Sequence, residues 1–334
     1  MALGNLEPHI GGVMSANKPK IGVLLPTRGI LLRGEQPDNA GRVFRMAERV
    51  EEAGLDSVWV GDSLIAKPRL EPLATLGALA ACTSRVRLGT AVLLPALRHP
   101  VLMAQTMATV DLISGGRLVI GAGVGGAFND EQRGEWAAAG VDPRRRASRF
   151  EEIVEIAKGL GPGRPHSHEG RHFSLDSVTM LPRATQSGGI PWLLATHHRA
   201  RQQAQIDRAA RVGDGVIAIS DTPEEFAEVI AQVDAKAEEY GRDTARRENV
   251  FYLTVNLDED EAAAQADAED WLMRYYGANI WGTRWGPFGG VQHVADRMAA
   301  YAESGADTLV VRLATFEPER QLDVFLDRIA PQFA

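Results

Sequence analysis

The residues with the clearest chemical signature are the glycines of the stretch 116–126, GRLVIGAGVGG. Gly121, Gly123 and Gly126 have the Gly-x-Gly-x-x-Gly spacing of a dinucleotide-binding loop, whose backbone N–H groups approach a pyrophosphate. Such a loop opens directly into a helix, and an acidic residue ends the next strand. Here the polar segment AFNDEQRGEW follows, and Asp142 precedes PRRRASRF rather than a strand boundary. The pattern therefore favours a glycine-rich strand end in another α/β fold, where the backbone can lie close to a flat or phosphorylated ligand.

Other reactive residue types are sparse. The single cysteine, Cys82, lies in the apolar run LGALAACTS and is expected to be a small core residue. His197 and His198 are adjacent and point to opposite sides of an extended chain, so we do not expect them to chelate a metal. Apolar walls with a few hydroxyl groups suit an organic cofactor that performs the chemistry itself.

The amino-acid composition limits the classes of binding partner and the cellular location that we expect. The chain has 334 residues, 45% of them apolar, and a net charge of −8 with the charges scattered, which argues against a nucleic-acid partner. Residues 1–19 lack the apolar stretch of a signal peptide and are expected to be a flexible leader, with Met14 as an alternative start. No run approaches the ~18 apolar residues of a membrane span. One cysteine fits a reducing compartment, so we expect a cytoplasmic protein.

The elements that would position a site alternate along the chain. Nearly continuous apolar runs, typical of parallel strands buried on both faces, lie at 21–25, 57–60, 86–94, 117–122, 191–195, 215–219, 249–256 and 307–313. Segments of helical period lie at 39–53, 72–82, 100–112, 146–160, 199–212, 222–240, 259–275, 291–304 and 318–329. About eight strand–helix units predict an α/β fold, a (β/α)8 TIM barrel, as a single domain over 20–334 with an insertion at about 161–190. In this fold the active site lies at the carboxyl ends of the strands.

Several of these segments resemble the luciferase-like monooxygenase superfamily. The resemblance runs from about 21 to 330 and is carried by DSVWVGDSL (56–64), the block 71–126, FSLDSVTMLPRATQSGGIPWLL (173–194) and RAARVGDGVIAIS (208–220). It implies a TIM barrel that binds reduced FMN or the deazaflavin coenzyme F-420. The family often has a non-proline cis peptide in the third strand, which would fall at Ala91–Val92 here.

The resemblance also implies where the cofactor binds. The ring would lie over the end of the third strand, and the cofactor-binding residues at the ends of strands two to four would be Asp62, Thr90, Ala91, Val92, Gly123 and Val124. The phosphate or side-chain pocket would lie after strands five and six, at Ala195, Thr196, His197 and Ser220. Backbone N–H groups at a helix start could hold a phosphate there.

The chain departs from the family at three positions that bear on chemistry. Ser63 stands where many members have a catalytic histidine, Val124 stands where members have an arginine or an acid, and Ala195-Thr196 replaces a glycine pair. The residue types therefore show no proton shuttle, and Ser63 and His99 are the weak catalytic candidates. His99 precedes Pro100 at a helix start, so packing is an alternative role.

An aromatic-rich segment lies at about 271–290, between the seventh and eighth strands. Trp281, Trp285 and Phe288 are candidates for the roof of an apolar substrate pocket. A small satellite core or a dimer patch remains open as an alternative, since aromatic residues are also abundant at interfaces.

Together these features predict a luciferase-like monooxygenase that uses reduced FMN and molecular oxygen on a small apolar organic substrate. A separate flavin reductase would supply the reduced FMN, and the family implies a homodimer. One alternative is a hydride-transfer oxidoreductase that depends on the deazaflavin coenzyme F-420. Another is a barrel that binds a flavin or another small molecule without turnover.

Overall fold

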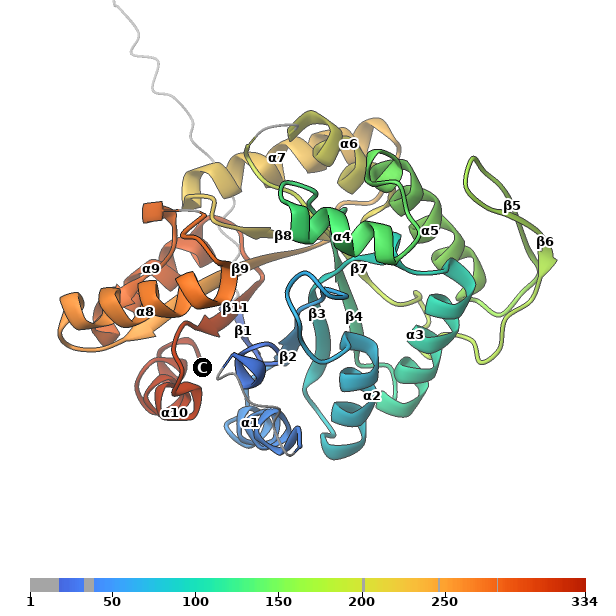
Figure 1. The fold of residues 1–334 in the computed structure, drawn as a ribbon. Helices are drawn as coiled ribbons and strands as arrows, with labels where there is room; N and C mark the ends of the chain where they lie inside the picture. The colour runs from blue at the N-terminus through green and yellow to red at the C-terminus, as the bar shows by residue number, and fades with distance from the viewer. Residues whose placement is uncertain (1–17, 33–38, 200–201, 246, 281) are drawn as a thin grey trace, which may run out of the picture.

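Eight parallel strands form a closed barrel in the computed structural model, which describes residues 18–334 except 33–38, 200–201, 246 and 281 (Figure 1). The strands follow one another around the barrel, and pairing of β8 with β9 closes the ring. They are β1 (Lys20–Leu24), β2 (Ser57–Val60), β3 (Arg87–Leu93), β4 (Leu118–Ala122), β7 (Trp192–Ala195), β8 (Gly215–Ile219), β9 (Glu248–Leu257) and β11 (Thr308–Leu313). The structure confirms the predicted TIM barrel.

Helices cover the outside of the barrel (Figure 1). They are α1 (Gly41–Glu52), α2 (Pro72–Cys82), α3 (Pro100–Ser114), α4 (Asp130–Ala138), α5 (Arg146–Leu160), α6 (Gln202–Val212), α7 (Pro223–Glu239), α8 (Glu261–Tyr276), α9 (Val291–Glu303) and α10 (Pro318–Arg328). Proline occupies the first turn of α2, α3, α7 and α10, where its missing N–H leaves no bond unmade. None of the described helices is both long and apolar enough to cross a membrane.

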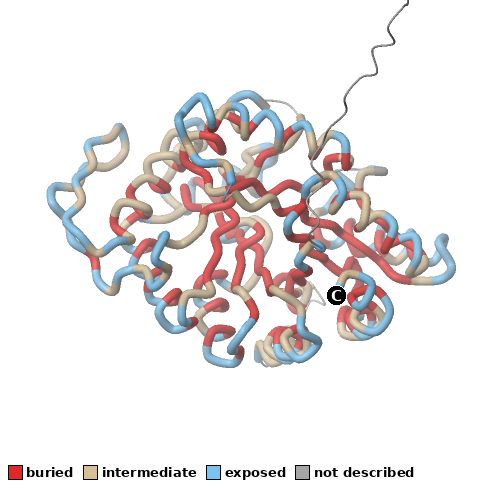
Figure 2. The backbone as a smooth tube through the Cα atoms, turned by 180° about the vertical axis from the view of Figure 1, so that it is seen from behind, coloured by how far each residue is buried: buried red, intermediate tan, exposed pale blue. Residues whose placement is uncertain are grey.

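The core has an outer layer between strands and helices and an inner layer inside the barrel (Figure 2). Trp59 is fully buried in the inner layer. Gly22 and Gly89 make room for it, because a Cβ at either position would collide with the indole ring. Its Nε1–H donates to the Oγ of Ser57 at 2.9 Å, so its polar atom is satisfied.

The insertion after the fourth strand contains a two-stranded hairpin, β5 (His166–Glu169) and β6 (Ser174–Val178), which projects from the side of the barrel (Figure 1). Two carboxylates, one buried and one half-buried, anchor the insertion to α3 and α5. Asp111 of α3 accepts from the backbone N–H groups of Thr185 and Gln186, and Glu152 of α5 accepts from those of 171–173.

The aromatic-rich segment lies between the seventh and eighth barrel strands, as expected. It supplies the end of α8 and the short strand β10 (Phe288–Gly289), which pairs with β9. At the other end of the chain, the Nζ of Lys18 donates to the carbonyl oxygen of Ala334, so the start of β1 lies beside the last residue.

Candidate functional site

A cavity of about 940 Å³ opens at the carboxyl ends of β3, β4, β7 and β8. It has the size typical of a small-molecule site. Its lining includes six residues that the sequence assigned to cofactor binding: Val92, Gly123, Val124, Ala195, His197 and Ser220. Most of the other lining residues lie between β4 and α6 in the sequence, in the stretches 125–133 and 143–147 and at Arg199.

The edge of the cavity on β3 is irregular. The Ala91–Val92 peptide bond is cis, as expected, and the pairing of β3 with β4 shifts register between Thr90 and Leu93. Of the three β3 residues that were expected to bind the cofactor, Thr90, Ala91 and Val92, only Val92 lines the cavity. Thr90 is fully buried and its Oγ1 donates to the carbonyl oxygen of Gly121 at 2.8 Å, while Ala91 faces the barrel interior.

The glycine run of β4 serves close packing of strands. A Cβ on Gly121 would collide with the carbonyl oxygen of Thr90, and one on Gly123 would lie 3.0 Å from Cγ2 of Val92. Helix α4 begins only at Asp130, and the loop before it does not have the strand–turn–helix geometry of a dinucleotide fold. Gly123 lines the cavity and has no side chain, so the backbone itself is exposed to the cavity between Val92 and Ala195.

The ends of β7 and β8 continue the lining beside β4. Ala195, His197 and Ser220 line the cavity, and Ser220 has a positive φ of 66°. Thr196 does not line it, because it is fully buried and its Oγ1 donates to the carbonyl oxygen of Leu194 at 3.0 Å.

His197 and Asp221 form a pair of perturbed groups at this wall. Burial and the charge of Arg199 lower the pKa of His197 to about 4. Burial raises the pKa of Asp221 to about 6, although the backbone N–H of His198 donates to its carboxylate. The Nδ1 of His197 lies 3.8 Å from Oδ2 of Asp221, beyond hydrogen-bond distance. At neutral pH His197 is therefore uncharged and can donate one hydrogen bond to a ligand.

The remaining wall is cationic, which the sequence did not reveal. Five arginines from α4, α5, α6 and the loops before them line the cavity, and none of the described lining residues is acidic: Arg133, Arg144, Arg146, Arg199 and Arg208. Arg133, Arg144 and Arg208 pair with Asp130, Asp142 and Glu151, which lie outside the lining. These arginines come from two regions of the sequence, 133–146 and 199–208, and only the run RRR at 144–146 is basic in the sequence itself.

The two catalytic candidates and Asp62 lie outside the lining of the cavity. Ser63 donates to Glu135 at 2.6 Å and accepts from the backbone of Lys67, and it is buried. His99 is exposed and its ring lies edge-on to Phe173, with 6.0 Å between centroids. The carboxylate of Asp62 binds Arg98 and the backbone N–H of Leu94.

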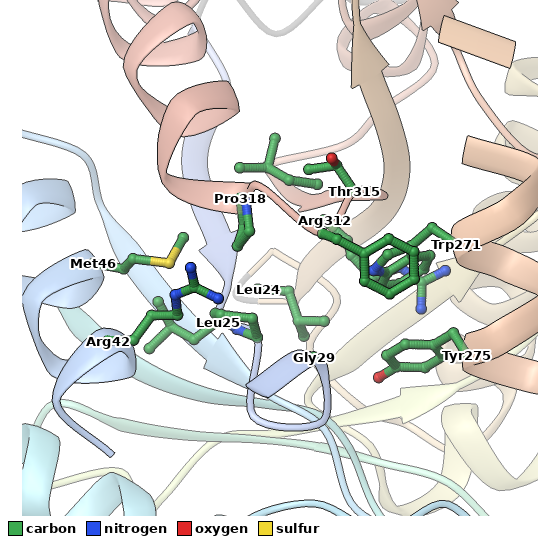
Figure 3. Close-up of a pocket in the computed structure, with 13 residues that line it drawn as sticks. Leu24, Leu25, Gly29, Arg42, Met46, Trp271, Tyr275, Arg312, Thr315 and Pro318 are labelled. Carbon is green, nitrogen blue, oxygen red and sulfur yellow. The ribbon is translucent and has the colours of Figure 1, made fainter. Parts of the chain in front are cut away.

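The predicted substrate roof also lies elsewhere. Trp285 and Phe288 are buried in a cluster with Trp271 and Tyr275 of α8, not in the lining of the large cavity. Figure 3 shows Trp271 and Tyr275 beside Arg312 of β11. Trp281 lies outside the described residues. No group of three metal-ligating side chains occurs in the part of the chain that the structure describes.

Comparisons with known proteins agree with the barrel fold. Residues 19–286 match the family described as luciferase-like monooxygenase. The chain is 31% identical over 242 residues to an F420-dependent glucose-6-phosphate dehydrogenase of Kineococcus radiotolerans, covering 69% of this chain and 68% of that one. It is 25% identical over 242 residues to a 5,10-methylenetetrahydromethanopterin reductase of Methanopyrus kandleri, covering 70% and 66%. The chain thus matches about two thirds of the length of these curated relatives.

A solved structure is similar over nearly the whole chain. The crystal structure of monooxygenase RslO1 from Streptomyces bottropensis has a TM-score of 0.77 at 25% identity, covering 94% of this chain and 100% of that one.

Proposed function

The chain belongs to the luciferase-like monooxygenase family of oxidoreductases, and we propose that it is a hydride-transfer enzyme that binds the deazaflavin coenzyme F-420 in the large cavity. The observation that carries the proposal is the lining of that cavity, which combines apolar residues around Gly123 with five arginines and, among the described residues, no acidic side chain. The F420-dependent relative at 31% identity supports the choice of coenzyme.

The residues present fit this group. A planar ring suits the apolar surface made by Val92, Gly123 and Ala195, and the phosphate and carboxylate groups of the coenzyme suit the guanidinium groups of the cationic wall. When bound in its reduced form, the coenzyme supplies a hydride. The cavity walls orient the ring and exclude water, and neutral His197 donates a hydrogen bond without adding charge.

A second candidate is the monooxygenase reaction, in which reduced FMN from a separate reductase reacts with molecular oxygen. The similarity to monooxygenase RslO1 over nearly the whole of both chains favours it. The same apolar surface and cationic wall would hold the ring and phosphate of FMN, so the two candidates differ in the cofactor and not in the residues of the cavity.

The test is an anaerobic titration of the purified protein with F-420, oxidised FMN, reduced FMN and riboflavin, followed by fluorescence. We expect F-420 to bind more tightly than either form of FMN by at least about tenfold, because it offers more negative groups to the arginines. Tighter binding of reduced FMN would establish the second candidate. No affinity for any of the four would contradict both and favour a barrel with another ligand.

A charge variant tests the cationic wall separately. Arg133→Gln and Arg144→Gln, each made alone, should weaken F-420 and FMN binding, most strongly at low salt, and leave riboflavin binding unchanged, because riboflavin has no phosphate. Arg328→Gln is the matched control, since this exposed arginine pairs with Glu259 at a distance from the cavity lining. Equal effects of the three changes would show that only the net charge of the protein matters.

A further inference from the structure

A buried carboxylate lies directly behind the lining of the large cavity. Asp221 follows Ser220, which lines the cavity, and its side chain is fully buried. Its Oδ2 accepts from the backbone N–H of His198 at 3.2 Å, and Tyr301 of α9 donates to its backbone carbonyl oxygen at 2.6 Å. Its Oδ1 is buried and has no hydrogen-bond partner among the residues that the structure describes. Burying such an oxygen costs free energy while the group is charged.

The imidazole of His197 also has a buried atom that lacks a partner. His197 lines the cavity, and 25% of its side chain is exposed. Its Nδ1 is buried, lies 3.8 Å from Oδ2 of Asp221 and forms no hydrogen bond within the described part of the chain. Its backbone N–H donates to Oε1 of Gln205, another lining residue, at 2.9 Å. The ring therefore lies between the buried carboxylate and the cavity.

The charges around Asp221 leave it close to the point at which it takes up a proton. Burial raises the pKa of Asp221 to about 6, and the negative charge of Glu225 acts in the same direction. The backbone N–H of His198 and the charges of Arg199 and His198 act in the opposite direction. Asp221 is therefore ionised at pH 7 in the protein without a ligand, and a modest change in its surroundings can protonate it.

Two ionisable neighbours of Asp221 keep their charge state near neutral pH. Hydrogen bonds from Arg284 lower the pKa of Glu225 to about 2, so Glu225 stays ionised. Burial raises the pKa of Tyr301 to about 12, so Tyr301 stays neutral. The remaining neighbour is the ring of His198, whose Nε2 lies 2.9 Å from Glu228 and which is not part of the cavity lining.

An anion in the cavity would favour the protonated form of Asp221. The five lining arginines attract an anion, and its negative charge beside His197 disfavours a second negative charge behind the ring. Protonation removes the charge of Asp221 and gives Nδ1 of His197 a donor, once the two side chains approach each other by about 1 Å. A neutral imidazole whose Nδ1 accepts has its proton on Nε2, which is then a donor for the anion.

We propose that binding of an anionic group in the large cavity is coupled to protonation of Asp221, which then donates to Nδ1 of His197 and leaves the Nε2–H of that ring to donate to the anion. His197 contacts the ligand, and Asp221 is a positioning residue that fixes the tautomer of the ring. The proton comes from solvent, and no covalent bond of the ligand changes. That the anion belongs to the coenzyme rests on the proposed function, whereas the coupling itself does not.

The test measures proton uptake when inorganic sulfate, an anion that does not itself titrate near neutral pH, binds to the full chain. Calorimetry at pH 7 in two buffers of different ionisation enthalpy gives the number of protons. If the anion raises the pKa of Asp221 by about one unit, the native protein takes up about half a proton, and its affinity falls about fivefold from pH 6 to pH 8.

Asp221→Asn replaces the acid by a neutral side chain that can donate to Nδ1 at every pH. This variant should take up no proton and should bind sulfate about tenfold more tightly than the native protein at pH 8. Asp221→Ala should also take up no proton but should bind more weakly than Asp221→Asn, because it has no donor for the ring. His197→Ala should weaken sulfate binding by about tenfold.

The matched control is His198→Gln, which removes the adjacent histidine outside the cavity lining and should leave proton uptake unchanged. Infrared difference spectra should show the C=O band of a protonated carboxyl when sulfate is added to the native protein, and no such band with Asp221→Asn. Absence of sulfate binding or of proton uptake in the native protein, or equal uptake by Asp221→Asn, would overturn the proposal.

Titration with F-420 and FMN separates this proposal from the proposed function. The phosphate groups of these cofactors titrate themselves, so proton uptake is compared between the native protein and Asp221→Asn, in which that contribution cancels. Cofactor binding with equal uptake by the two proteins would reject the coupling alone. Proton-coupled sulfate binding without affinity for either cofactor would reject the proposed function alone.

Discussion

The carboxylate of Asp62 and the guanidinium of Arg98 form a two-point ion pair with N–O distances of 2.5 and 3.0 Å. The same carboxylate accepts from the backbone N–H of Leu94 at 2.8 Å. Leu94 lines the large cavity, so Asp62 acts on the cavity through the backbone at the exit of β3.

We predict that Asp62→Asn weakens the anchoring of the backbone at Leu94, where the chain leaves β3. Loss of the charge from a side chain that is 1% exposed should lower the free energy of unfolding by about 2 kcal/mol. Affinity for the cofactor should fall by about tenfold. Urea unfolding and fluorescence titration measure the two effects. Glu71→Gln is the control, because Glu71 also pairs with Arg98 but does not contact Leu94. The idea fails if the two variants bind cofactor alike.

The absence of a side chain at Gly123 gives a second prediction. A Cβ there would lie 3.0 Å from Val92 and 3.5 Å from Ala195, both in the cavity lining. Gly123→Val should therefore weaken cofactor binding by more than about tenfold and cost about 1–3 kcal/mol of stability. Gly134→Ala in α4 is the matched control, since nothing lies within 4 Å of its added Cβ. Unchanged affinity in Gly123→Val would place the ring elsewhere.

The raised pKa of Asp221 makes stability depend on pH. Burial raises this pKa from 3.8 to about 6, so the folded state holds the proton more tightly than the unfolded chain. The stabilising contribution is complete below pH 3.8 and is lost as the pH rises through about 6. A difference of about two pKa units corresponds to at most about 3 kcal/mol.

Asp221→Asn should accordingly be more stable than the native protein at pH 7, by about 1–3 kcal/mol, with an advantage that shrinks toward pH 4. Urea unfolding at several pH values measures the difference, and the contribution of His197 cancels because both proteins contain it. A variant that is less stable than the native protein at pH 7 would show that the carboxylate is paired in solution.

The anchoring of the insertion makes a fourth prediction. Asp111 is fully buried and accepts from the backbone of Thr185 at 2.7 Å and from Nε2 of Gln186 at 2.8 Å. Asp111→Ala leaves the backbone N–H groups of Thr185 and Gln186 without this acceptor and should cost about 3 kcal/mol. Limited proteolysis near 183–189 should become faster. Asp130→Ala, at a side chain that is 98% exposed, should change stability by less than about 0.5 kcal/mol. Equal stability of both variants would contradict the anchoring role.

The barrel could be predicted from sequence because its strands are apolar on both faces and its helices begin with proline. The bounds of Ser57–Val60 and Gly215–Ile219 agree with the structure, as does the helix Pro72–Cys82. Helix α4 was not predicted. Its sequence DEQRGEWAA lacks an apolar stripe, and it is held by Trp136, which is buried and donates to the carbonyl oxygen of Gly126 at 2.7 Å. Glu135 is a second anchor, because its buried carboxylate accepts from Ser63 and from the backbone of Ile65 and Ala66. Two adjacent anchors leave no periodicity in the sequence.

The cavity was predicted in part. The predicted strand ends indicate roughly where the cavity lies. The direction of each side chain, however, depends on the local register, which shifts in β3. Val92 therefore faces the cavity while Thr90 and Ala91 do not. The arginines of the cationic wall come from α4, α5, α6 and the segments before them, so only the folded chain brings them together.

The contact of Lys18 with Ala334 has a consequence for chain connectivity. A peptide linker of a few residues could join these two positions, and new ends could be opened at Gly170, in the turn of the projecting hairpin. Such a circular permutant would visit the strands in a different order yet pair each with the same neighbours. Closure of the barrel depends on which strands pair in space and not on the order of the strands along the chain.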